Sequence, residues 1–248
     1  TFSDAVDNAN SPAREILARP MRLAVETAEG VIDWQGGRAA VTGQHPGAVT
    51  WESRNTGGPF QMLCRAKMES DGYINYTITI QALRETDLKD ARLEIPYRRE
   101  VAKYMMGLGC KGGLRPPALQ WKWSVDRANN VVWIGDVNAG LHCKLKGAQD
   151  VWELYNLKNS GVPESWSNGG QGGCVLREES PEVALLQAYS GPRRLRPGQE
   201  LSFRFGLMAT PVKTLNPAHW NWRYWHQRSP VEEVARGREA VVVRRSRT

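Results

Sequence analysis

The chain has 248 residues, of which 41% are hydrophobic and 24% are charged, the balance of a folded globular protein rather than of a disordered one. No apolar run approaches the ~20 residues that a membrane-spanning helix needs, so the sequence predicts no contact with a membrane. Of the net charge of +7, the last thirteen residues contribute five Arg and one Glu. A nucleic-acid-binding domain concentrates basic residues on a folded face, so this distribution argues against nucleic acid as a partner.

The first clear elements are two strands that form a hairpin. Apolar residues occupy every second position from Met62 to Met68 and again from Ile74 to Ile80, and mostly polar residues lie between them. A period of two places each set on one face of a strand. The turn dipeptide Asp71-Gly72 separates the two runs. The sequence therefore predicts a long β-hairpin over residues 62–80.

Strands are expected along most of the remaining chain up to residue 207. Leu201–Leu207 alternates in the same way, whereas the glycine-rich residues 165–173 are expected to be a flexible loop. Shorter candidate strands are Met21–Thr27, Ala48–Glu52, Ala91–Tyr97, Val131–Ile134, Leu141–Leu145, Cys174–Arg177 and Val183–Tyr189. Many strands with Gly and Pro between them favour an all-β fold, a large antiparallel β-sandwich of two stacked sheets.

The sequence changes character after Pro211. An aromatic segment follows, in which we expect interdomain packing by Trp220, Trp222, Tyr224 and Trp225. A short helix is predicted over residues 230–236, and the apolar run 240–243 is typical of a strand buried on both faces in a parallel α/β fold. We therefore expect a β-sandwich domain over 1–212 and, over 213–248, an aromatic linker with the truncated start of a (β/α) barrel. A frayed C-terminus is the alternative.

The motifs of catalysis and of cofactor binding find little support. Residues 107–112 match G-x-G-x-x-G, but Pro116-Pro117 follows where a dinucleotide-binding helix would run, so a surface loop is the better interpretation. The cysteines, Cys64, Cys110, Cys143 and Cys174, form no C-x-x-C pair, and His142-Cys143 is more simply explained as a buried strand position than as a pair of ligands. We expect no catalytic residue, no metal and no cofactor, and the disulfide state stays open.

The strongest candidate for binding is aromatic and polar. Trp121 and Trp123 lie on the same face of a predicted strand, and Asp136 and Asn138 follow a little further on. Indole rings stack on the C–H faces of sugars, and Asp and Asn hydrogen-bond to hydroxyl groups. These four residues are therefore the candidate carbohydrate site. The alternative is that the two large aromatic side chains fill the core of the sandwich.

At these residues the sequence resembles a known family. The segments Trp121–Trp123, Val132–Gly147, Gly191-Pro192, Phe203–Lys213 and His219–Tyr224 are similar to the N-terminal domain of proteins of glycoside hydrolase family 123, and the resemblance spans roughly residues 20–226. It implies a β-sandwich followed by a catalytic (β/α)₈ barrel. Characterised relatives are β-N-acetylgalactosaminidases that use the acetamido group of the substrate, oriented by an Asp-Glu pair in the barrel. No barrel is present in this sequence, so no catalytic residue is carried over.

Three hypotheses follow for the function. The first is a non-catalytic sandwich domain that packs against the catalytic barrel of the same polypeptide and shapes its sugar cleft, with glycans that contain N-acetylhexosamine as the expected carbohydrate. The second is a stand-alone carbohydrate-binding module, and the third is a structural scaffold with buried tryptophans. The solvent exposure of Trp121 and Trp123 separates the second from the third. The sequence leaves the localisation open, with a secreted or periplasmic setting as one alternative.

Overall fold

The computed structural model of the protein describes residues 14–124, 126–148, 162–211, 223–225 and 240–242. The chain divides into two compact units, Thr1–Val212 and Lys213–Thr248. In the described ranges the first unit contains two antiparallel sheets and the second a single pair of short strands. No helix in these ranges is long and apolar enough to cross a membrane.

The larger sheet has nine strands, and its centre is the predicted hairpin. Its strands, in spatial order, are β3 (Gln35–Gly36), β5 (Ala48–Gly57), β6 (Phe60–Glu69), β7 (Ile74–Ala82), β16 (Glu200–Thr210), β12 (Gly140–Lys146), β11 (Val131–Gly135) and β9 (Tyr104–Gly107), with β4 (Ala40–His45) also paired to β5. Met68 pairs with Ile74 at the β6–β7 turn, as the alternation predicts. The turn is fixed by Gly72, at φ 87°, and by the backbone N–H of Tyr73, which donates to Asp71 Oδ1 at 2.9 Å.

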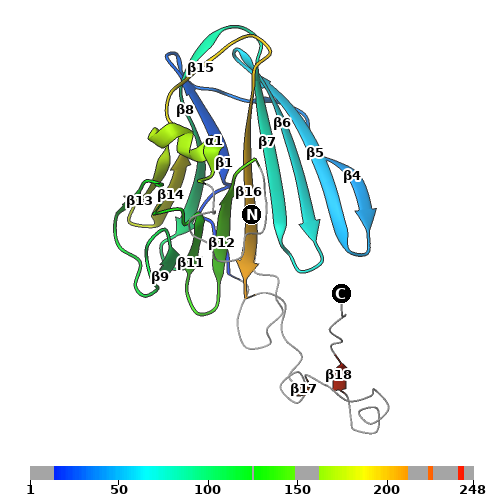
Figure 1. The fold of residues 1–248 in the computed structure, drawn as a ribbon, viewed down its shortest axis with the longest axis vertical. Coiled ribbons are helices and arrows are strands. Elements are labelled where there is room, and N and C mark those ends of the chain that lie inside the picture. The colour runs from blue at the N-terminus through cyan, green and yellow to red at the C-terminus, as the bar shows by residue number, and fades with distance from the viewer. Residues whose placement is uncertain (1–13, 125, 149–161, 212–222, 226–239, 243–248) are drawn as a thin grey trace. The chain divides into compact units, whose positions relative to one another are not determined.

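The smaller sheet has seven strands, with the longest strand, β8, at its centre (Figure 1). Its members are β10 (Leu119–Trp121), β13 (Gly173–Ser180), β14 (Val183–Tyr189), β8 (Thr86–Arg98), β1 (Arg22–Thr27) and β2 (Gly30–Val31), and β15 (Arg193–Leu195) pairs with the far end of β8. All of these pairings are antiparallel. The all-β sandwich predicted from the sequence is therefore confirmed.

One hydrophobic core joins the inner faces of the two sheets. Every second side chain of β7 and β16 points into it, among them Ile78 and Ile80 of β7 and Phe203 of β16. The smaller sheet contributes Leu93 and Ile95 of β8. Burying a side chain of this size stabilises the fold by about 1.5–3 kcal/mol relative to leaving it exposed. The alternate residues of the larger sheet lie on its opposite side, which we call the outer face.

The glycine-rich segment that was expected to be a flexible loop contains the one short α-helix of the described chain, α1 (Glu164–Ser167), followed by a 3₁₀ turn, η1 (Asn168–Gly170). Trp166 explains the difference. Its side chain is fully buried, its ring centroid lies 4.8 Å from that of Phe203, and its Nε1 donates to the carbonyl oxygen of Arg204 at 3.0 Å. Because α1 packs against β16 and β14, one strand from each sheet, the indole ties the two sheets together.

The glycine-rich segment after β9 is a loop, as the two following prolines indicate. Gly107, Gly109, Gly112 and Gly113 all have positive φ angles. A side chain at Gly107 would place its Cβ 2.1 Å from the carbonyl oxygen of Val131, so only glycine fits there.

The second unit holds two paired strands in its described residues. These are β17 (Arg223–Trp225) and β18 (Ala240–Val242), which run parallel, with Tyr224 opposite Val241. A strand is therefore present at 240–242, within the run 240–243 where one was predicted, and the segment interpreted as a linker contributes a strand of its own through Tyr224 and Trp225. Trp220, Trp222 and the helix predicted over 230–236 lie outside the described residues.

We expect the substitution Trp166→Ala to destabilise the first unit by about 3–5 kcal/mol, because it leaves a large cavity between the sheets and removes the hydrogen bond to Arg204. Urea unfolding followed by circular dichroism measures this loss. Val137→Ala is the control, since Val137 is 83% exposed and its truncation should change stability by less than about 0.5 kcal/mol. Equal stability of the two variants would contradict the role given to Trp166.

Candidate functional site

The two tryptophans predicted to stack on sugars are buried. Trp121 is 4% exposed and Trp123 is 7% exposed, and both belong to the hydrophobic core. Trp121 packs beneath Gly109, where an added Cβ would come within 2.6 Å of its ring, and the Arg127 guanidinium lies 4.4 Å from the ring centroid. The Nε1 of Trp123 donates to the carbonyl oxygen of Asn129 at 3.0 Å. This placement leaves neither ring open to a sugar and favours the alternative that both indoles fill the core.

The predicted Asp136 and Asn138 lie in the turn between β11 and β12 of the nine-stranded sheet, whereas Trp121 belongs to β10 of the seven-stranded sheet. Asp136 Oδ1 accepts hydrogen bonds from the backbone N–H groups of Asn138 and Ala139, at 2.8 and 2.9 Å. Its Oδ2 pairs with Arg14 at 2.7 Å and lies 3.7 Å from the ammonium of Lys103. The carboxylate therefore organises the turn. Asn138 is half-buried beside it.

These partners set the charge state of Asp136. Burial by itself would raise the pKa of this carboxyl group. The amide donors of Asn138 and Ala139 and the positive charges of Arg14 and Lys103 outweigh that effect and lower its pKa below the ordinary 3.8. Asp136 is consequently ionised over the whole neutral range.

His142 and Cys143 cannot converge on one metal ion, because neighbouring residues of a strand point to opposite faces. Cys143 points into the core, where burial raises the pKa of its thiol to about 12. His142 is half-buried on the outer face, and burial lowers its pKa. The four cysteines are free in this structure. Among the described residues, no group of three or more His, Cys, Asp or Glu side chains is placed to hold a metal ion.

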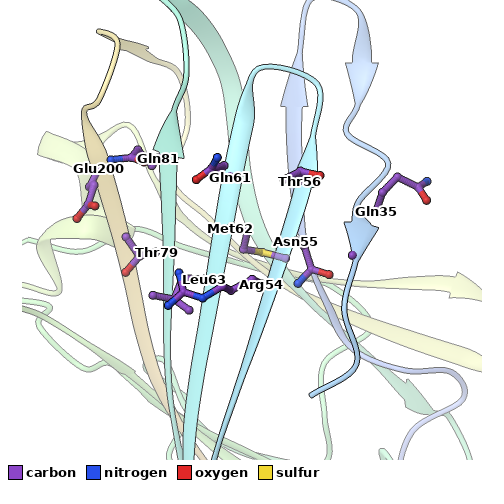
Figure 2. A pocket seen from close by; sticks show the side chains of 11 residues that line it. Gln35, Arg54, Asn55, Thr56, Gln61, Met62, Leu63, Thr79, Gln81 and Glu200 are labelled. Atoms are coloured by element: carbon purple, nitrogen blue, oxygen red, sulfur yellow. The ribbon is translucent and has the colours of Figure 1, made fainter. Parts of the chain in front are cut away.

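A groove of about 320 Å³ crosses the outer face of the nine-stranded sheet (Figure 2). It is lined by Gln35, Gly36, Arg54, Asn55, Thr56, Gln61, Met62, Leu63, Thr79, Gln81 and Glu200. We call it the polar groove. A second hollow of about 300 Å³ on the same face is lined by Thr50, Glu52, Arg65, Lys67, Asn75 and Thr77, among others.

Strand register arranges the polar groove as two rows across β5, β6, β7 and β16. The first row is Thr56, Gln61, Gln81 and Glu200, each paired with the next, and the second is Arg54, Leu63 and Thr79, which Ser202 of β16 continues beyond the lining residues. Within the second row the hydroxyl groups of Thr79 and Ser202 lie 2.9 Å apart and share a hydrogen bond. The surface therefore offers amide, hydroxyl and guanidinium groups at the spacing of adjacent strands, about 4.8 Å.

The positive charge of Arg54 is balanced locally. Its guanidinium lies 2.8 Å from Glu52, which also accepts a hydrogen bond from Arg65 at 2.9 Å. The hydrogen bond from Arg65, together with the charge of Arg54, outweighs partial desolvation and lowers the pKa of Glu52. The groove thus presents hydrogen-bonding groups without a strong positive field.

The sequence predicts these strands but not this groove. Thr79 is one of the polar residues that the alternation places between apolar ones, whereas Gln61 and Gln81 lie just outside the two predicted runs. The signal that was available is the run of amide and hydroxyl side chains on the outer face of β7, namely Asn75, Thr77, Thr79 and Gln81.

Two antiparallel sheets around one core, with a polar hydrogen-bonding groove on one outer face, define the chain as a β-sandwich domain. It belongs to the family described as glycoside hydrolase 123, third domain, whose model matches residues 1–211. The chain is therefore a domain of a carbohydrate-active protein. The sequence-based expectation of an N-terminal domain is wrong, because the matching family is the third domain, and a third domain accompanies others in its polypeptide.

Solved structures with a similar arrangement of strands are distant in sequence. A galactose mutarotase related enzyme from Lactobacillus acidophilus has 9% identity and a TM-score of 0.40, with 71% of this chain and 72% of that one covered. A putative mutarotase from Salmonella typhimurium has 10% identity and a TM-score of 0.43, with 73% and 65% covered. A heparan sulfate lyase from Pedobacter heparinus has 8% identity and a TM-score of 0.34, with 82% of this chain and 23% of that one covered. No curated protein matches the chain.

If Asp136 organises the turn, the substitution Asp136→Asn should destabilise the fold by about 1–3 kcal/mol at pH 7, the range for a hydrogen bond to a charged group. Because the folded-state pKa lies below the unfolded value, the ionised carboxylate stabilises the fold above about pH 4, and this contribution is lost as the pH falls through the folded-state pKa. Urea unfolding of both proteins between pH 3 and 7 should therefore show curves that converge at the acid end.

The exposed Asp126 provides the control, since Asp126→Asn should leave stability within about 0.5 kcal/mol at each pH. A different result would support the sugar-binding hypothesis for this residue: weaker glycan binding by Asp136→Asn with no change in stability.

Proposed function

We propose that this domain is a non-catalytic β-sandwich of a glycoside hydrolase that binds a neutral glycan in the polar groove, and that in its polypeptide it packs against a catalytic barrel and shapes the sugar cleft. The observation that carries the proposal is the pair of rows of amide and hydroxyl side chains across β5, β6, β7 and β16. Membership in a glycoside hydrolase family supplies the class of ligand.

The chemistry of the groove suits sugar hydroxyl groups. A hydroxyl group is both a donor and an acceptor, and so are the amide of a Gln and the hydroxyl of a Thr. Gln61, Gln81 and Thr79 therefore match it in either direction. The half-buried Leu63 adds an apolar contact between them. Each new hydrogen bond contributes a net of about 0.5–1.5 kcal/mol, so useful affinity requires several of them at once.

The charges favour a neutral glycan over an anionic one. Arg54 is already paired with Glu52, and Glu200 places a negative charge at the end of the first row. A sulfated or carboxylated polysaccharide would have to displace Glu52 from Arg54 and lie beside Glu200. A neutral sugar accepts hydrogen bonds from Arg54 and donates to Glu200 without that cost.

The set of side chains that lines the groove supports binding of a glycan rather than its cleavage. Most glycosidases place two carboxyl groups on either side of the scissile bond. Among the described residues that line the groove, Glu200 is the one carboxylate. The catalytic step is accordingly proposed for another domain of the polypeptide. The resemblance to family 123 points to glycans that contain N-acetylhexosamine.

The second unit supports the proposal of a neighbouring α/β domain. Its strands β17 and β18 are parallel, and residues 226–239 connect them. A connection between parallel strands of one sheet must cross over, which in α/β folds is the work of a helix. We propose that residues 213–248 begin such a domain and that Trp220, Trp222, Tyr224 and Trp225 pack between it and its neighbours.

The double substitution Gln61→Ala/Gln81→Ala tests the polar groove. Removing two amides should weaken glycan binding by about 1–3 kcal/mol, or roughly 5- to 150-fold in Kd. Isothermal titration calorimetry with chitotetraose and with a β-N-acetylgalactosaminide oligosaccharide measures this change. The wild-type chain should release no reducing sugar from either compound.

Gln120→Ala is the matched control, because Gln120 is an exposed amide on the seven-stranded sheet and its loss should leave Kd unchanged. Binding that survives the double substitution would show that the groove is not the site. Absence of binding by the wild-type chain to both oligosaccharides would leave the scaffold hypothesis, which the burial of Trp121 and Trp123 favours.

A further inference from the structure

An aromatic feature of the outer face lies at the opposite end of β16 from the polar groove. Trp133 of β11 is on the outer face, opposite His142 of β12, and its side chain is half-buried. The next two positions on the same face, Gly135 and its cross-strand partner Gly140, carry no side chain. No side chain therefore covers the backbone at the two positions over which the indole of Trp133 lies.

The indole ring occupies the space above these glycines. A Cβ built on Gly140 would lie 2.6–2.7 Å from three atoms of the Trp133 ring, and one on Gly135 would lie 2.8 Å from it. Cβ atoms do not approach a ring so closely, so both glycines are required for the ring to lie against the backbone. One face of the indole is thus covered by the sheet, and the other is turned away from it.

The orientation of the ring is fixed at its far end. Trp133 Nε1 donates a hydrogen bond of 2.8 Å to Oγ1 of Thr210, which is paired with Gly140 on the next strand, β16. The indole therefore crosses β12 above Gly140 and is held at both ends. We call Trp133 with Gly135 and Gly140 the indole platform.

Exposed apolar side chains extend the platform along β9. Met106 is paired with Trp133 and is 54% exposed, and Tyr104 is paired with Gly135 and is 37% exposed. A similar contact occurs nearer the centre of the face, where an added Cβ on Gly206 would lie 2.0 Å from the hydroxyl oxygen of Tyr73. A glycine on the outer face therefore lies beneath an aromatic side chain in both places.

We propose that the indole platform is a stacking site for a pyranose ring of a neutral glycan. A flat aromatic ring, fixed in orientation before binding, matches the apolar C–H face of a sugar and loses little side-chain entropy on binding. The proposal rests on the proposed function for the class of ligand, but its residues are separate from those of the polar groove. Glu200 and Thr210 are ten residue steps apart on β16, which corresponds to about 33 Å along the strand.

The ordinary structural explanation is that Trp133 only covers the backbone near the edge of the sheet. The two explanations differ in what a ligand does to the ring. A stacked sugar changes the environment of the ring face that is turned away from the sheet and requires the flat orientation, whereas a structural cover responds to no sugar.

Protein labelled with 5-fluorotryptophan separates these explanations by ¹⁹F NMR. The chain has 10 tryptophans, and the resonance that disappears in Trp133→Phe identifies Trp133. We expect this resonance to shift on titration with chitotetraose or cellotetraose and to stay in place with sorbitol, which has hydroxyl groups but no ring face. An unchanged resonance at saturating oligosaccharide would overturn the proposal.

Measurements of oligosaccharide affinity test whether binding depends on the flat orientation of the Trp133 ring. Trp133→Ala should weaken binding roughly 5- to 10-fold, the scale of one aromatic contact. Gly140→Ala should weaken it to a similar extent with Trp133 intact, because the new methyl group lifts the ring from the sheet. Gly47→Ala is the matched control, since a Cβ there has no neighbour closer than 3.7 Å. Trp133→Phe, which lacks the hydrogen bond to Thr210, is the substitute test variant if Gly140→Ala does not fold.

The outcomes separate this inference from the proposed function. Full affinity of the Trp133 variants, with loss in Gln61→Ala/Gln81→Ala, would reject the indole platform and retain the groove. Loss in the Trp133 and Gly140 variants alone would support the platform and reject the groove. A wild-type chain that binds none of the oligosaccharides contradicts both.

Discussion

The period-two alternation of the long central strands is the constraint on which the rest of the structure depends. In β7 and β16 every second residue is committed to the core between the sheets, from Ile78 and Ile80 to Phe203. A shift of register by one residue would exchange the two faces and bury the polar set, so the register is strongly specified. The residues of the outer face are therefore held at fixed positions by a core to which they do not themselves contribute.

This separation allows one domain to carry both of the surfaces that we propose for a glycan. The polar groove and the indole platform share β16, with Glu200 near one end and Thr210 at the other. Neither depends on a loop of special conformation, since the side chains come from paired strands. Such a surface is preorganised, and a ligand that binds to it need not order it first.

The alternation in the sequence predicted the strands and the class of fold, because the local period carries that information. It could not predict which strands are neighbours: β16 pairs with β7, more than a hundred residues earlier, and with β12. Nor could it place α1, where a single buried indole, Trp166, orders a segment rich in glycine. Pairing and burial are properties of the whole core, which a local pattern does not contain.

The candidate site shows the same limit. The spacing of Trp121 and Trp123 predicts a shared strand face, but β10 ends at Trp121, and a period of two cannot tell the core from the solvent side; both side chains are buried in the core. The carboxylate of Asp136 predicts hydrogen bonds to sugar hydroxyl groups, whereas its position two residues before Asn138 in a tight turn indicates that it accepts hydrogen bonds from the backbone of the turn. The indole on the outer face is Trp133, whose signal is the absence of side chains at Gly135 and Gly140, visible only once β11 and β12 are paired.

The central claim, that the outer face of the nine-stranded sheet is the glycan-binding surface, is tested most directly by mapping amide chemical shifts of the isotope-labelled chain during titration with chitotetraose. The account predicts that the amides that move belong to β5, β6, β7, β16 and β11, with little change in β8 and β14. Shifts confined to the seven-stranded sheet, or no shift at millimolar oligosaccharide, would contradict it.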